Sequence, residues 1–315
     1  MSYASGGLIE ATDYNNIVGT NTSVTSTHLN AMWAWGANSR GYGQTAVSQV
    51  SASSIVTATQ WASLVNTLNS ANTHINGSSS GLTANTAGQT ITYVSSLQSK
   101  VTGVNSDRML FGSNSAVVAG TGLAYTAWTS ASTSSNLVRY FGAKATFESA
   151  DKARFFFNCG GRLKFNATAV ASGSSRSTNA KATVDNLGGI ALFAANTNGG
   201  RTGSGGTQAD NITSVGYYQL TTSNVIIQSI NSTSSTYALD GGQILVKTNG
   251  TQGSFGDNGT QVDFWMQVFS GSGTNAGGLS FDDSLSLTVT VSIDVSYPEV
   301  TNLSNTWGAV TVTQL

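Results

Sequence analysis

The segment from Leu285 to Tyr297, LSLTVTVSIDVSY, alternates apolar and polar residues without a break. Every odd-numbered position is Leu, Val, Ile or Tyr, and every even-numbered position is Ser, Thr or Asp. Successive side chains of a β-strand point to opposite faces, so the pattern predicts a long strand with one buried and one solvated face. Such strands are typical of antiparallel sheets that cover an apolar core on one side.

Similar but shorter patterns predict that most of the chain after residue 110 is β-structure. We expect a mainly β protein with an α-helical N-terminal region (residues 1–110), followed by an antiparallel β-sandwich (residues 111–315). A jelly-roll-like connectivity is compatible with this sandwich. The further strands are expected at 137–147, 153–171, 215–222, 225–230, 243–248, 261–269 and 308–313.

The first third of the chain contains an internal repeat. Residues 9–20, IEATDYNNIVGT, align without gaps on residues 56–67, VTATQWASLVNT. Each copy has a threonine near its start, which can cap a helix, and then an aromatic residue with aliphatic residues at i+3 and i+4. We therefore predict a duplicated capped helix, and shorter amphipathic sets predict further helices around 29–33 and 91–101. The apolar sets of the two copies are Tyr14, Ile17 and Val18, and Trp61, Leu64, Val65 and Leu68.

The composition is polar but almost uncharged. Charged residues make up 9% of the chain, where about 25% is typical of soluble domains. Aromatic residues (9%) and a single proline argue against disorder. A net charge of −1 gives weak repulsion between molecules, which a protein built into an assembly tolerates better than a free one.

Few residues are available for cofactor or metal chemistry. One cysteine, Cys159, excludes an intrachain disulfide and a cysteine-based zinc site, and His28 and His74 are the only histidines. His74 ends the second helix copy, where a histidine is favourable near the helix dipole. The glycine-rich runs at 120–122, 203–206 and 271–278 are not Walker sequences and do not lead from a strand into a helix. We therefore expect no cofactor, no metal and no enzymatic activity.

The positions of the charges bear on the partners. Residues 100–181 are mainly basic, whereas every charged residue after Lys247 is acidic. The basic residues are spread along predicted strands, so pairing with the acidic end, within or between subunits, is favoured over nucleic-acid binding. The N-terminus lacks a signal-peptide pattern, and no apolar run is long enough to span a membrane, so we expect synthesis in a cytoplasm without membrane insertion.

The stretch ARFFFNCGGRLKFNATAVA, residues 153–171, alternates through its two glycines. Interpreted as one strand, it places Cys159 on the buried face among phenylalanines, where a thiol is unreactive. The opposite face then presents basic side chains as subunit contacts. The candidate assembly contacts are Tyr14 and Trp61 from the helix copies and Arg154, Arg162 and Lys164 from this strand.

Several motifs together resemble a family of virion structural proteins of tailed phages, common among contractile-tailed phages of marine cyanobacteria. They are IEATDYNNIVG, GYGQTAVSQVSASSIVTATQWASLVNTLNSANTHING, ARFFFNCGGRLKF and VGYYQLTTSNVII, with the closing alternating strands. The resemblance extends from about residue 8 to residue 300. It implies a non-enzymatic particle component with no catalytic residues to transfer.

Three functions from different classes therefore remain open, while the missing signal pattern and the lack of calcium-binding nonapeptide repeats disfavour a further alternative, a secreted bacterial adhesin or surface-layer protein. The first is a virion structural protein in the tail, neck or baseplate, or a capsid decoration, made in the host cytoplasm. Its partners are other virion proteins and copies of itself, with a trimer as the expected homo-oligomer. The second is a receptor- or glycan-binding module at the tip of a tail fibre, which binds a host surface glycan. The third is an enzyme such as a depolymerase, for which the sequence offers few acidic residues.

Overall fold

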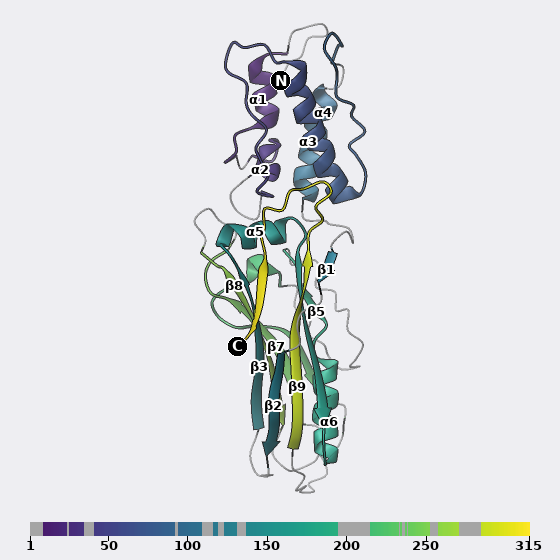
Figure 1. Cartoon of the computed structure of the whole chain (residues 1–315), viewed down its shortest axis with the longest axis vertical. Coiled ribbons are helices and arrows are strands. Elements are labelled where there is room, and N and C mark those ends of the chain that lie inside the picture. Colours follow the sequence, from purple (N-terminus) through teal and green to yellow (C-terminus); the bar gives the residue numbers. More distant parts are fainter. Residues whose placement is uncertain are drawn as a thin grey trace.

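A computed structural model shows an elongated molecule with helices at one end and two β-sheets at the other (Figure 1). Within residues 116–130 only the backbone of the two strands is described, without side chains. The described residues are 9–23, 25–34, 41–91, 94–108, 116–118, 123–130, 137–194, 215–232, 234, 237, 239–252, 258–270 and 285–315. The glycine-rich runs at 120–122, 203–206 and 271–278, and the boundary expected near residue 110, lie outside these residues.

The helical end confirms the predicted helix repeat. It contains α1 (Ala11–Val18), α2 (Asn30–Trp33), α3 (Ala58–Asn76) and α4 (Val94–Asp107). The cap of α3 is Thr57, whose hydroxyl accepts from Gln60 N at 3.3 Å while Gln60 Oε1 accepts from Thr57 N at 2.9 Å. In the first copy the N-cap is Glu10 rather than a threonine.

The first sheet is antiparallel, with β9 (Leu285–Tyr297) at its centre. One side of β9 pairs with β4 (Arg162–Ala171), which also pairs with β5 (Ile190–Leu192). The other side pairs with β1 (Ala116–Val118) near one end and with β2 (Leu123–Ser130) further along. The odd-numbered residues of β9 from Leu285 to Val295 are all buried, as their alternation predicts.

The second sheet is also antiparallel, in the order β10-β3-β8-β7-β6. Five of the predicted strands are thereby confirmed with small changes at their ends. The strands are β3 (Leu137–Phe147), β6 (Val225–Asn231), β7 (Gly241–Thr248), β8 (Gln261–Ser270) and β10 (Val310–Gln314). The architecture is thus two antiparallel sheets with several helices.

Side chains from the two sheets meet in one apolar core. Phe165 of β4 stacks on Phe264 of β8, with ring centroids 5.5 Å apart and planes inclined by 9°. Both side chains are fully buried. The same core continues into the helical end, where Trp61, Leu64 and Leu68 of α3 are buried. The helices and the sheets are therefore joined by continuous packing.

The prediction of one strand over 153–171 is wrong in its first half. The segment Ala150–Asn158 is a helix, α5, and only Arg162–Ala171 is a strand. Ser149 caps α5, and Ala153, Phe156 and Phe157 are buried at the i, i+3, i+4 spacing of a helix. The three consecutive phenylalanines supply an apolar residue to the strand period as well as to the helix period, and the serine cap decides for the helix.

Two further differences concern short or weakly apolar segments. The strand expected at 215–222 is a 3₁₀ turn, η2 (Tyr217–Gln219), whose Tyr217 ring stacks on Phe157 at 4.1 Å. A helix that the sequence pattern did not indicate, α6 (Ser175–Asn186), packs along β4 and β9. Its buried face includes Arg176 and Ser177 beside Val184, so it lacks the apolar stripe that identifies a helix.

The cap of α5 distinguishes the helix from the predicted strand. We expect Ser149→Ala to lower the free energy of unfolding by about 1 kcal/mol, because the Lys152 amide loses its acceptor. Ser292→Ala, on a partly exposed position of β9, is the control and should change stability by less than about 0.5 kcal/mol. Urea unfolding followed by circular dichroism measures both, and equal effects would contradict the capping role.

Candidate functional site

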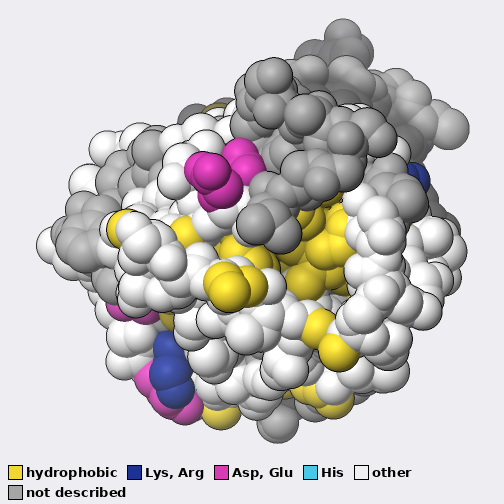
Figure 2. All heavy atoms as spheres, turned by 90° about the horizontal axis from the view of Figure 1, so that it is seen from above, with side chains coloured by type: hydrophobic (Ala, Val, Ile, Leu, Met, Phe, Trp, Pro, Cys, Tyr) yellow, Lys and Arg dark blue, Asp and Glu magenta, His cyan; other side chains and the backbone are white. Residues whose placement is uncertain are grey.

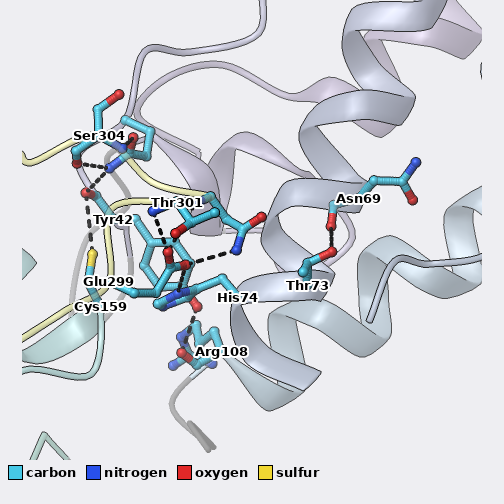
Figure 3. Close-up of polar contacts among 11 residues, drawn as sticks. Tyr42, Asn69, Thr73, His74, Arg108, Cys159, Glu299, Thr301 and Ser304 are labelled. Atoms are coloured by element: carbon cyan, nitrogen blue, oxygen red, sulfur yellow. Dashed lines mark hydrogen bonds and ion pairs between the residues drawn. The ribbon is translucent and has the colours of Figure 1, made fainter. Parts of the chain in front are cut away.

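Four segments that are distant in sequence meet where the helices join the sheets (Figure 3). They are residues 41–44, the last turn of α3, the residue after α5, and the chain between β9 and β10. We call this group the junction. Its central side chains are those of Tyr42, His74, Cys159 and Glu299.

The His74–Glu299 contact joins α3 to the chain after β9. His74 Nδ1 lies 2.8 Å from Glu299 Oε1, and the two side chains are 4% and 14% exposed. Burial lowers the pKa of His74, and the hydrogen bond and charge of Glu299 and the contact with the Cys159 backbone only partly offset this. His74 is therefore neutral at pH 7 and donates its Nδ1 proton to the carboxylate.

Glu299 also shapes the turn that follows it. Its Oε2 accepts from the backbone amides of Thr301 (2.6 Å) and Asn302 (3.0 Å), and its Oε1 accepts from Asn302 Nδ2 (3.1 Å). Burial raises the pKa of Glu299, but the hydrogen bonds from Asn302, His74 and Thr301 together lower it below its usual value. The carboxylate is therefore ionised at neutral pH and bound from both sides.

A second set of hydrogen bonds holds the same segment against residues 42–44. Gln44 Nε2 donates to Ser304 O, and Ser304 N donates to Gln44 Oε1, both at 2.9 Å. Thr306 Oγ1 donates to Tyr42 O at 2.7 Å, and the Tyr42 hydroxyl donates to Arg108 O at 2.7 Å. The Tyr42 ring meets His74 edge to face, with centroids 5.5 Å apart.

Cysteine, histidine and glutamate are the residue types of thiol-based catalysis, but their arrangement here does not suit it. The Cys159 thiol points to Tyr42 O at 3.7 Å and, among the described residues, makes no hydrogen bond to the imidazole. Burial, and then the charge of Glu299, raise the pKa of Cys159 well above its usual value. The thiol is therefore protonated and buried, as the sequence predicts, although it follows a helix rather than lying in a strand.

A groove lies beside the junction, between α3 and residues 300–304. Its volume is about 440 Å³, and none of its eleven lining residues is charged. Eight of them have a hydroxyl or amide side chain, and three are apolar. The lining residues are Trp33, Gln44, Ser63, Asn66, Thr67, Ser70, Val300, Thr301, Asn302, Leu303 and Ser304.

The outer face of the second sheet carries aromatic side chains, of which Tyr140 is exposed and Trp265 and Phe269 are partly exposed. Tyr140 of β3 is 53% exposed, accepts from Gln267 Nε2 at 2.7 Å, and meets Trp265 of β8 edge to face. The Trp265 ring lies over Gly142, where a Cβ atom would come within 2.6 Å of it. Phe269 lies over Gly241 in the same way. The rings therefore lie flat on the sheet, and we call this surface the aromatic face.

The far end of the helical region is hollowed. Figure 2 shows hydrophobic side chains gathered in a depression on this end. The cavity there has a volume of about 290 Å³ and includes Ile9, Val56, Trp61 and Ile91, with residues 85–89 at its edge. It opens where the N-terminal ends of α1 and α3 meet.

The structure does not bring the five predicted contact residues together. Tyr14 and Trp61 are 1% exposed, with ring centroids 6.5 Å apart, and Arg154 is fully buried, 3.2 Å from Asp151 and over the Phe155 ring. These three side chains pack inside the chain, which corrects their assignment to a surface. Arg162, over the Phe193 ring, and Lys164 are partly exposed on β4.

The junction could not be found from the sequence, because its bonded members are far apart in the chain: His74 and Glu299 by 225 residues, and Tyr42 and Thr306 by 264. By its position in the sequence, His74 is explained by the helix dipole alone, and Glu299 is one of several acidic residues near the C-terminus. The one available signal is the rarity of histidine, since His74 is one of two histidines in the chain.

Acid should weaken the junction. The pKa of His74 is lower in the folded chain, so the unfolded chain takes up protons first and stability falls as the pH drops below about 6.5. The lowered pKa of Glu299 adds a further loss as the pH falls below 4.5 and through the folded pKa. Urea midpoints measured between pH 7 and pH 5 should therefore fall.

His74→Gln tests this assignment, because glutamine can still donate to Glu299 but does not titrate. We expect the variant to lose most of the decline between pH 7 and pH 5. His28→Gln, at the other histidine, should keep the part of the decline that is due to His74. An unchanged pH slope in His74→Gln would show that the junction does not titrate in this range.

The Cys159 thiol should be protected in the folded chain. We expect a maleimide to label it at least tenfold more slowly in buffer than in 6 M urea, because it is 1% exposed and protonated. Mass spectrometry of the labelled chain measures both rates. Equal rates would contradict the burial of this residue.

Among the described residues, no helix is long and apolar enough to cross a membrane. The same residues contain no group of three His, Cys, Asp or Glu side chains placed to hold a metal ion. Comparison of the chain with models of protein families, with curated proteins and with solved structures found no match. The function is therefore inferred from the residues and their arrangement.

Proposed function

We propose that this chain is a non-enzymatic structural protein of a tailed-phage virion that assembles as a homo-oligomer through its aromatic face. The position would be in the tail, neck or baseplate, or on the capsid surface, after synthesis in the host cytoplasm. The observation that supports it best is the exposure of this face at the centre of a regular sheet. Exposed apolar area of this kind favours association with another protein.

The make-up of the aromatic face suits contact between subunits. Val138 (43%), Tyr140 (53%) and Ile226 (42%) are exposed on the same sheet as Trp265. Aromatic residues are enriched at interface centres, where large rigid rings contribute area at little cost in entropy. Two of the nearby lysines, Lys144 and Lys247, lie in register on either side of Asp263, which offsets part of their charge.

The architecture supports a structural role. We propose that the two sheets form a β-sandwich, which the stacked Phe165 and Phe264 support, and a jelly-roll-like connectivity remains part of the proposal. The polar groups of the junction support a non-enzymatic role, because Glu299 and His74 are bound to each other and Cys159 is protonated. The hollow at the helical end would accept an apolar side chain of another virion protein, and a trimer is the proposed homo-oligomer.

A charge on the aromatic face should prevent association. We expect the wild-type chain to sediment as an oligomer at about 10–50 μM, since the population of an oligomer depends on the protomer concentration. Val138→Asp should weaken association at least tenfold, because a carboxylate buried without a partner is strongly unfavourable. Analytical ultracentrifugation over a concentration series measures this change.

Val170→Asp is the matched control. Val170 is 70% exposed on β4 of the other sheet, so the same charge should leave the oligomer unchanged. A monomeric wild-type chain, or equal effects of both substitutions, would contradict the proposed interface. Peptides of this chain should also be found by mass spectrometry in purified phage particles, and their absence would contradict the virion location.

A further inference from the structure

We propose that the groove between α3 and residues 300–304 binds a neutral, hydroxyl-rich ligand, of which an uncharged oligosaccharide is the natural class. Its volume of about 440 Å³ lies within the roughly 300–1,000 Å³ common for ligand sites. This binding does not depend on the chain being a virion protein. It also differs in place from the aromatic face, because the groove lies between α3 and residues 300–304, where the helices join the sheets.

The polar side chains of α3 on the groove are available to a ligand. Ser63, Asn66, Thr67 and Ser70 recur at i, i+3, i+4 and i+7 and so form one stripe along the helix. Within the part of the chain that the structure describes, none of these four side chains makes a hydrogen bond. Their hydroxyl and amide groups can both donate and accept, which matches the hydroxyls of a sugar.

The adjacent polar stripe of the same helix is used differently. Asn69 Nδ2 donates to Leu82 O at 3.0 Å, and Asn69 Oδ1 accepts from Ser80 N at 3.0 Å. Asn72 Nδ2 donates to Ser78 O at 2.7 Å, and Thr73 Oγ1 donates to Asn69 O at 2.8 Å. Asn69 and Asn72 hold the chain that follows α3, and Thr73 bonds within the helix, so the unbonded stripe on the groove is not a general property of this polar helix.

The opposite wall of the groove is held in place from behind. Glu299 binds the amides of Thr301 and Asn302, and Gln44 binds both backbone groups of Ser304 (Figure 3). Leu303 is 3% exposed and anchors the segment in the core. A wall fixed in this way loses little conformational entropy when a ligand binds.

Two apolar groups on the groove suit the C–H faces of a sugar ring. Trp33 is partly exposed, and its indole Nε1 donates to Thr45 O at 3.0 Å, which fixes the plane of the ring. Val300 is 66% exposed in the opposite wall. Large apolar surfaces beside a few directed polar groups are the usual make-up of a ligand site.

The absence of charge among the eleven lining residues selects between ligand classes. An anionic glycan or a nucleotide would lose hydration without gaining a cationic partner. A neutral oligosaccharide exchanges hydrogen bonds with water for equivalent bonds to hydroxyls and amides. The groove therefore favours a neutral sugar over its sialylated or sulfated counterpart.

The test uses the full chain on an array of neutral oligosaccharides, with sialylated, sulfated and uronic acid glycans beside them. Isothermal titration calorimetry with the best neutral binder then gives the affinity. We expect Asn66→Ala to weaken it about threefold to tenfold, the loss of one or two hydrogen bonds to an uncharged ligand. Asn76→Ala, the same change at an exposed position of α3 outside the groove, should leave it unchanged.

Neutral binding that Asn66→Ala weakens and Asn76→Ala does not would support the proposal. Acidic glycans as the only binders, no binder on the array, or equal effects of the two substitutions would overturn it. Peptide binding at the groove, seen as Asn66-dependent binding from a peptide library without any glycan binder, would also overturn it. Both asparagines are exposed, so the circular dichroism of both variants should match the wild type.

Discussion

The carboxylate of Glu299 is the contact on which the arrangement of the molecule depends. The chain leaves the first sheet at Tyr297, crosses to the helices at Glu299, and then enters the second sheet at Val310. One segment therefore touches all three parts of the fold. Four hydrogen bonds to a single carboxylate hold that segment at its start, and removal of the carboxylate would leave four donors without their acceptor.

The low charge of the chain explains why amides perform most of the long-range bonding. Asn30, which is 1% exposed, donates to Gly19 O and Val47 O and accepts from Val47 N. Asn15 makes a similar reciprocal pair with the backbone of Val50. A buried amide with all its partners avoids the desolvation cost of a buried ion, so the loops can pack closely without paired charges. This use of asparagine leaves few ionised groups for chemistry.

The sequence predicts those helices and strands whose apolar residues follow a single spacing, either that of a helix or that of a strand. The alternation of Leu285–Tyr297 is long enough to exclude a helix, and the aromatic and aliphatic spacing around Trp61 excludes a strand. The run around Phe156 has apolar residues at helix spacing and also at strand spacing. The serine cap at Ser149 is a weaker signal in the sequence than the alternation that continues to residue 171. The groove and the junction lack any local signal, because residues 33, 44, 63–70, 74 and 299–304 meet only in the folded chain. Sequence indicated the types of these residues but not their meeting.

The groove and the junction share one segment, and this links ligand binding to stability. Residues 300–304 form a wall of the groove and are also bonded to Glu299 and to Gln44. A ligand that binds only the folded wall stabilises the folded chain by RT ln(1 + [L]/Kd), so at a concentration of about 100 Kd the gain is about 2.7 kcal/mol. The same linkage acts in reverse, because any change that loosens Glu299 disorders the wall and raises the entropic cost of binding.

The aromatic face lies on a sheet that makes its own ladder of hydrogen bonds, so association through it is independent of this segment except at β10. The proposed ligand binding and the proposed assembly therefore use separate surfaces, so that substitutions in one can leave the other unchanged.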